Sequence, residues 1–107
     1  MNRYGIVYYN DLECGIIKET DDGFVFTYKK EYLESIGNNP ISLNIPLSDK
    51  EYFSTVLHPF FDGLIPEGWL LDIAANKWGI KRNDRMGLLL TVCEDTIGAV
   101  SVRGVIR

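Results

Sequence analysis

The spacing of apolar residues changes near the middle of the chain, and this change limits the folds open to it. Up to residue 47, apolar and aromatic residues alternate with polar ones in several short runs, as in strands with one buried face. From residue 59 to residue 90, apolar residues recur at helical spacing, and no repeat or linker separates the two parts. We therefore predict one α+β domain over residues 1–107, a small antiparallel sheet with a cluster of short helices against it.

The chain begins with a predicted hairpin. Residues 4–9 and 12–18 are rich in Ile, Val and Tyr, and the Asn10-Asp11 pair between them suits a tight turn. In the second of these strands, Cys14 and Ile16 alternate with polar or small residues, so we expect them on one face.

Three further segments complete the first half. Asp21-Asp22-Gly23 predicts a turn into a third strand with one aromatic face, formed by Phe24, Phe26 and Tyr28. Residues 29–36 predict a short helix, with Tyr32, Leu33 and Ile36 at helical spacing and residues 37–40 ending it. Strict alternation over residues 41–47 predicts a half-buried strand whose end is marked by Pro46.

Prolines and caps divide the second half into helices. We expect one helix after Pro59 and a second over residues 67–78, opened by Pro66 and closed by Gly79. Asn83 is expected to cap a third helix over residues 84–90. Residues 98–105 return to a strand, with Val100 and Val102 on one face.

Composition and charge exclude several classes of protein. With 107 residues and 46% hydrophobic content, the chain can form one core, and it is neither disordered nor long enough for two domains. Its net charge of −4 argues against binding nucleic-acid phosphates alone. No apolar run suits a signal peptide or a membrane span, so we expect a cytoplasmic protein without membrane contact. Cys14 and Cys93 match no metal or redox spacing and are expected to be small buried residues.

Few residues suggest chemistry. His58 is the only histidine, and no nucleophile elbow, phosphate loop or calcium loop accompanies it, so a capping role is favoured over a small enzyme built around it. We predict no catalytic residue, no cofactor and no metal. Lys77, Lys81, Arg82 and Arg85 form a basic cluster that could meet an acidic partner or a phosphate, although a solvated helix end is favoured.

The segment from Phe60 to Trp69, together with the helix that follows it, is the most informative part of the chain. Apolar residues gather on one broad side of the expected helix, with Asp72 and Asn76 on the opposite side. The pattern buries Trp78 and leaves Trp69 on the polar side, just after Pro66-Glu67-Gly68. An exposed indole there is either a binding anchor or a side chain folded back over the domain, and the pattern supports both equally.

Three segments in order resemble a known family. Residues 60–68, Phe-Phe-Asp-Gly-Leu-Ile-Pro-Glu-Gly, resemble the FF-x-x-LLPEG segment of the HipA-type serine/threonine kinases. Residues 41–47 are similar to their ISLSLPL strand, and residues 88–90 with 95–100 are similar to their LL…G-x-D-x-x-GAV segment. Cys93 stands where that family usually has glycine. The resemblance covers residues 4–102 and only the N-terminal subdomain, because the nucleotide-binding and catalytic segments have no counterpart.

This resemblance implies a partner and a role. A free-standing version of the subdomain is similar to HipS, the antitoxin of the tripartite HipBST toxin–antitoxin systems. There it would bind and neutralise a HipT-like kinase, with a HipB-like helix-turn-helix protein in a ternary complex that supplies any contact with DNA. The alternative is a structural subunit that completes a split HipA-like kinase without inhibiting it. The residues expected to contact the kinase are Ile65, Pro66, Glu67, Gly68, Trp69 and Asp72, with Trp69 as the anchor.

Overall fold

A five-stranded antiparallel sheet forms the centre of the computed structural model, which describes residues 3–35, 37–94, 96 and 98–105. The strands lie in the order β4-β3-β2-β1-β5. Their bounds are β1 Tyr4–Tyr9, β2 Leu12–Glu19, β3 Phe24–Tyr28, β4 Tyr52–Ser54 and β5 Val100–Gly104. The expected α+β architecture is therefore confirmed, and β5 returns from the far end of the sequence to pair with β1.

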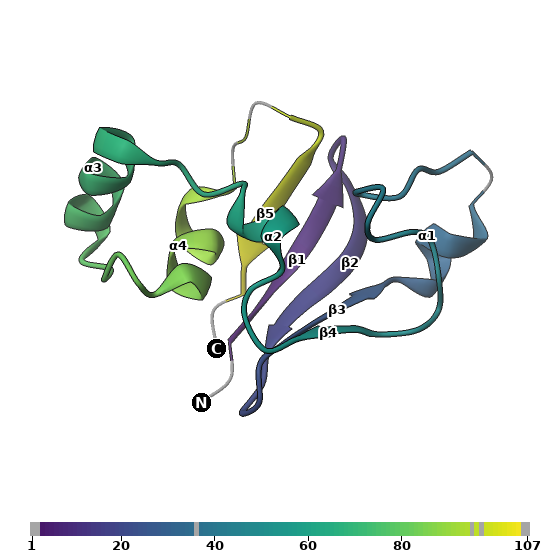
Figure 1. Cartoon of the computed structure of the whole chain (residues 1–107). Coiled ribbons are helices and arrows are strands. Elements are labelled where there is room, and N and C mark those ends of the chain that lie inside the picture. Colours follow the sequence, from purple (N-terminus) through teal and green to yellow (C-terminus); the bar gives the residue numbers. More distant parts are fainter. Residues whose placement is uncertain (1–2, 36, 95, 97, 106–107) are drawn as a thin grey trace.

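Four short helices accompany the sheet, and they are not distributed evenly around it. Their bounds are α1 Lys30–Glu34, α2 Pro59–Asp62, α3 Gly68–Trp78 and α4 Arg85–Val92. In Figure 1, α2 lies over the central strands and α4 lies beside the edge strand β5, while α1 lies near the opposite edge of the sheet. Helix α3 packs against α4 and lies at the outer side of the molecule, away from the sheet.

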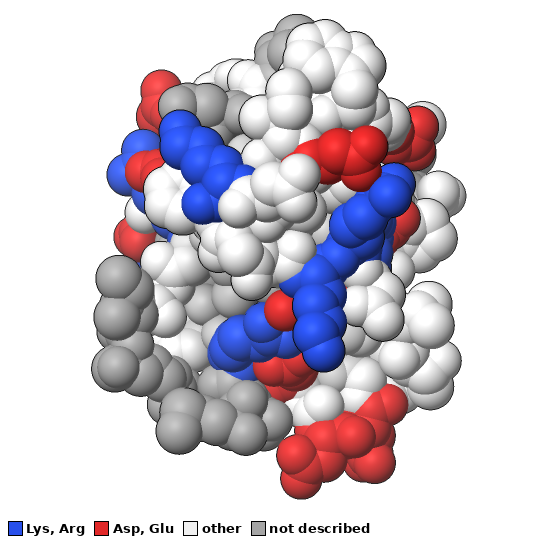
Figure 2. Space-filling view, turned by 90° about the vertical axis from the view of Figure 1, so that its left-hand side faces the viewer, with Lys and Arg blue, Asp and Glu red and all other residues white. Residues whose placement is uncertain are grey.

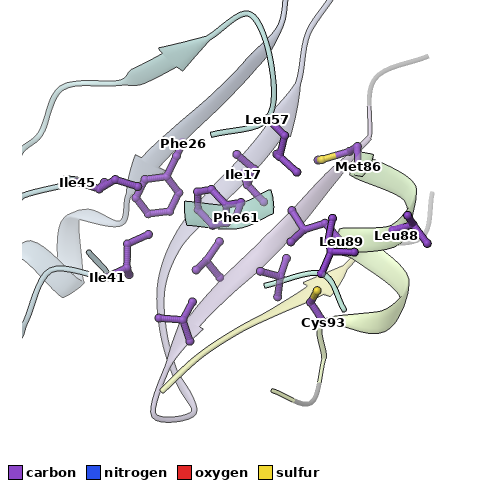
Figure 3. Packing of buried hydrophobic residues seen from close by; sticks show 14 of the residues in the cluster. Ile17, Phe26, Ile41, Ile45, Leu57, Phe61, Met86, Leu88, Leu89 and Cys93 are labelled. Atoms are coloured by element: carbon purple, nitrogen blue, oxygen red, sulfur yellow. The ribbon is translucent and has the colours of Figure 1, made fainter. Parts of the chain in front are cut away.

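One continuous core joins the sheet to α2 and α4. Figure 3 shows the ring of Phe61 from α2 between Ile17 and Phe26 of the sheet, with Met86 and Leu89 of α4 farther along it. The aromatic face expected for β3 is confirmed, because Phe26 and Tyr28 are only 2% and 3% exposed. Tyr28 also donates a hydrogen bond to the carbonyl of Ile45, which holds the following loop against the sheet.

The strand predicted over residues 41–47 is absent. Only an isolated bridge joins Ser42 to Ile45, and the segment is otherwise a turn. Ile41 and Ile45 are buried, whereas Leu43 is 95% exposed, so the buried positions are four residues apart rather than two. The edge strand is β4 instead, in a segment for which no strand was predicted, and it pairs with β3 through Phe26 and Tyr52.

The prediction that Cys14 and Ile16 share one face of β2 is wrong, because a β-bulge interrupts this strand. Val7 lies opposite Gly15 and Tyr8 opposite Glu13, which leaves Cys14 as an extra residue on β2. Cys14 is completely buried, but the inward side of β2 then continues with Gly15 and Ile17 rather than with Ile16. The extra residue shifts the alternation by one position, which the sequence pattern alone could not reveal.

The capping residue of α4 also differs from the prediction. The Asp84 carboxylate accepts a hydrogen bond from the backbone N–H of Gly87, so Asp84 rather than Asn83 caps this helix. The same carboxylate lies against the guanidinium of Arg3, which also contacts Glu19. The expected end of α3 is confirmed, because Gly79 has a φ of 66° and closes the helix in the left-handed conformation.

Candidate protein-binding site on helix α3

The residues before α3 form a sharp corner. Ile65 is only 2% exposed and fastens the corner to the core, while Pro66 follows at the surface. Glu67 is extended, with φ −118° and ψ 169°, and Gly68 then turns into the helix with a φ of +63°. A residue with a side chain rarely adopts that φ, so glycine at position 68 sets the direction in which α3 leaves the corner.

Trp69 lies on the surface directly after this corner. Its side chain is 70% exposed, so of the two alternatives that the pattern left open, the indole is exposed and does not fold back over the domain. Trp78 was predicted to be buried, and this is wrong, because it is 55% exposed. The physical reason is that α3 packs against α4 rather than the sheet, and only Leu71 and Ala75 are covered.

Helix α3 consequently exposes much more apolar surface than a surface helix usually does. Leu70 is 51% exposed and Ile73 is 54% exposed, in addition to the two tryptophans. Single exposed apolar residues are common in soluble proteins, but several on adjacent turns of one helix mark an interaction site. The sequence pattern identified the apolar side of α3 but not the fact that most of it is uncovered.

A groove lies beside this exposed surface. It runs between α3 and the segment from Gly63 to Pro66, and it has a volume of about 690 Å³. Its wall on α3 includes Leu70, Ile73 and Trp78, and its lining is mainly apolar. The groove cannot be predicted from the sequence, because it depends on the angle between α3 and the preceding loop.

Two of the four residues of the basic cluster are paired with carboxylates in the folded chain. Arg85 lies 2.6 Å from the Asp62 carboxylate, and Arg82 lies 3.1 Å from that of Asp72. Figure 2 shows the side of the molecule that carries α3, where a band of basic side chains runs diagonally and carboxylates lie against it. These pairs make the favoured interpretation, a solvated helix end, the better description of Arg82 and Arg85. Asp72, one of the expected partner contacts, is exposed but engaged with Arg82.

The remaining candidate residues have structural roles. The Nδ1 atom of His58 accepts a hydrogen bond from the backbone N–H of Phe60, so the histidine caps α2, as predicted. Burial raises the pKa of both Cys14 and Cys93 to about 12, which keeps these thiols protonated. Among the described residues, no three His, Cys, Asp or Glu side chains gather as metal ligands would.

Comparison with known proteins places this geometry in a family. The sequence profile of the HipA N-terminal domain matches residues 5–103. The chain belongs to the HipA N-terminal domain family. It is 34% identical over 101 residues to an uncharacterised protein of Haemophilus influenzae, and the match covers 94% of this chain and 92% of that protein. The solved structure of the N-terminal domain of HipA toxin superposes with a TM-score of 0.70 at 27% identity, covering 98% of this chain and 94% of that one.

The family assignment connects this HipA N-terminal domain with toxin–antitoxin proteins and accounts for its fold. Cys93 has a φ of −98°, so its backbone conformation does not require glycine. Its thiol is buried and lies 3.4 Å from the carbonyl of Leu64. In the described part of the chain, the helices are too short or too polar to cross a bilayer.

Proposed function

We propose that this HipA N-terminal domain acts as an antitoxin, which binds a HipT-like serine/threonine kinase and neutralises it. The observation that carries the proposal is the 70% exposure of Trp69 at the first turn of α3. Tryptophan is the residue type most enriched in the energetic centres of protein interfaces. Membership of a family that includes the N-terminal domain of a toxin supports a kinase of the same system as the partner.

The corner before α3 suits Trp69 to this role. Ile65 is anchored in the core and Pro66 has a fixed φ, so the backbone that leads to Trp69 is partly fixed before binding. Binding then orders few additional groups, and less conformational entropy is lost. Glu67 and Gly68 are exposed beside the indole and complete the contact surface, together with Asp72.

The partners follow from the same assignment. A HipB-like helix-turn-helix protein would join the domain and the kinase in a ternary complex in the cytoplasm, and it would supply any contact with DNA. The net charge of −4 supports a protein partner, because a domain of this charge gains nothing from phosphate contacts. The proposal assigns the domain no catalytic step, cofactor or metal.

Replacement of Trp69 tests the proposal in a kinase assay. We expect the purified domain to abolish phosphorylation by the kinase and Trp69→Ala to weaken the complex about thirtyfold, the equivalent of roughly 2 kcal/mol at an interface centre. Trp78→Ala is the matched control, since it removes a second exposed indole from the same helix. Equal inhibition by all three proteins, with unchanged folding, would contradict the anchor role.

The sign of the effect separates the proposal from its alternative. A structural subunit that completes a split kinase would preserve or raise kinase activity when the purified domain is added. An antitoxin would lower it, and co-expression with the kinase would restore growth. A rise in activity would refute the antitoxin role while leaving the interaction itself in place.

A further inference from the structure

The residues of α3 that line the groove range from Ile73, about 40° around the helix axis from Trp69, to Trp78, about 180° from it. From position 69 to position 78 the helix turns through about 900°, which is two and a half turns. The two indoles therefore project in nearly opposite directions around the helix axis. Trp78 lines the groove, and Trp69 is not among the residues that line it. The groove therefore adjoins the Trp69 surface at Ile73 and extends away from it towards Trp78.

The dimensions of the groove suit a helix of another protein. Its wall on α3 extends from Leu70 to Trp78, a distance of about 12 Å at 1.5 Å per residue. That length accommodates two turns of a partner helix, whose anchors would be three, four and seven residues apart. Leu64 and Val92 form other parts of the lining and are half-buried, so side chains entering the groove would meet apolar surface.

The scarcity of polar groups argues against a small-molecule ligand. Sites for small ligands combine an apolar lining with several converging polar groups that orient the ligand. Apart from Lys77, the only polar side chain among the described residues that line the groove is that of Thr96. Apolar side chains along a helix need no such orienting contacts.

Lys77 determines the charge that the groove prefers. It is the only charged residue among the described residues that line the groove, and it lies on the exposed apolar side of α3. Its ammonium group lies 5.5 Å from the ring centre of Trp78, and no carboxylate pairs with it within the described part of the chain. By contrast, neighbouring Arg82 is already paired with Asp72. A carboxylate on the partner would complement Lys77.

We propose that this groove binds an amphipathic helix of a second protein, one that places apolar side chains against Trp78 and an acidic side chain near Lys77. Trp69 does not line the groove, although Ile73 of the lining is its neighbour on the helix.

The test uses the two indole signals of the chain. The sequence contains two tryptophans, so the indole N–H groups give two resonances, which Trp69→Phe and Trp78→Phe assign. The probe is a synthetic amphipathic helical peptide of about four turns, with leucines along one face and glutamates beside them. We expect the Trp78 signal to shift on titration while the Trp69 signal stays in place.

Charge and shape variants complete the test. Lys77→Glu is expected to weaken binding of the acidic peptide about tenfold. A peptide with lysines in place of its glutamates should bind the wild-type domain as weakly as the acidic peptide binds Lys77→Glu. Lys81→Glu, an exposed change outside the lining, is the matched control. Trp78→Ala is expected to weaken binding about thirtyfold.

Three outcomes would overturn the inference. The first is the absence of any shift of the Trp78 signal with the acidic peptide. The second is equal binding by wild type and Lys77→Glu. The third is a shift of the Trp78 signal with protein concentration alone, which would identify a second copy of the chain as the occupant. None of these results depends on a kinase, so failure here is distinct from failure of the Trp69 proposal.

Discussion

The Nη2 atom of Arg3 lies 2.9 Å from Oδ1 of Asp84 and ties the start of β1 to the first turn of α4. A second bond, between Nη1 of Arg3 and Oδ2 of Asp84, makes the contact bidentate. Arg3 also contacts both carboxylate oxygens of Glu19 on β2. One guanidinium thus joins two strands to a helix that is more than 80 residues away in sequence, and its pKa is raised by these two carboxylates.

Asp84 both caps α4 and binds Arg3, and two substitutions separate these roles. Asp84→Asn keeps a good capping side chain but loses the ionic contact, so we expect a loss of about 1 kcal/mol in the free energy of unfolding. Asp84→Ala loses both and should cost about 2 kcal/mol. Denaturant unfolding measures the difference. Asn83→Ala should be neutral, and a larger loss there than at Asp84 would contradict the observed cap.

The Arg3 cluster makes stability depend on acid pH. Hydrogen bonds from Arg3 hold the pKa of Glu19 and of Asp84 below their ordinary values of 4.5 and 3.8. Their stabilisation is therefore fully present above about pH 4.5 and is lost as the pH falls through the lowered pKa values.

We expect Arg3→Met to remove about 1 kcal/mol at pH 7, a modest value because the groups are partly exposed and screened by solvent. The difference between wild type and variant should shrink towards pH 3, since protonated carboxyl groups no longer attract Arg3. Thermal unfolding across this range provides the measurement. A constant difference at all pH values would show that the cluster contributes no ionic stabilisation.

A side chain at position 68 is expected to strain the backbone, although it would not clash with any neighbouring atom. Its φ is +63°, and a Cβ atom added there would have no neighbour within 4 Å, so any cost comes from the backbone alone. Gly68→Ala should lower the free energy of unfolding by about 1–2 kcal/mol. Gly98→Ala is the control, because Gly98 has equal space and no positive φ. Equal stability of the two variants, measured by denaturant unfolding, would contradict this.

Cys93 is expected to make the fold more stable than a glycine at this position would. Its thiol is 1% exposed, and its backbone at φ −98° does not need glycine. Cys93→Gly should cost about 2 kcal/mol, from the cavity and the added freedom of the unfolded chain, and Cys93→Ala about 1 kcal/mol. Chemical denaturation of both variants tests the order. A glycine variant as stable as wild type would show that the thiol contributes no packing.

The comparison of sequence with structure is most instructive at residues 41–47. The alternation of Ile41, Leu43 and Ile45 is that of a strand, but no partner strand is available there within the described residues. Tyr28 instead donates its hydroxyl hydrogen to Ile45 and accepts one from the N–H of Ile41, and these two contacts turn the segment inward. Local pattern does not record a long-range contact of this kind, and for the same reason the β4 strand was missed.

The candidate site was predictable in part. The sequence placed Trp69 on the polar side of α3, because this placement needs only the helical period and the position of Pro66. The exposure of Trp78 and the groove beside it were not predictable. A helical pattern indicates which side is apolar, but not whether the fold supplies enough surface to cover it.

The sequence by itself determined the elements whose causes are local. These are the Asn10-Asp11 and Asp21-Gly23 turns, the strands beside them, and the helix that ends at Gly79. Tertiary structure alone decided the bulge at Cys14, the cap at Asp84 and the uncovered side of α3. Each of these depends on contacts between residues far apart in the chain. Turns and helix ends follow from the backbone preferences of neighbouring residues, whereas burial depends on which surfaces the complete fold brings together.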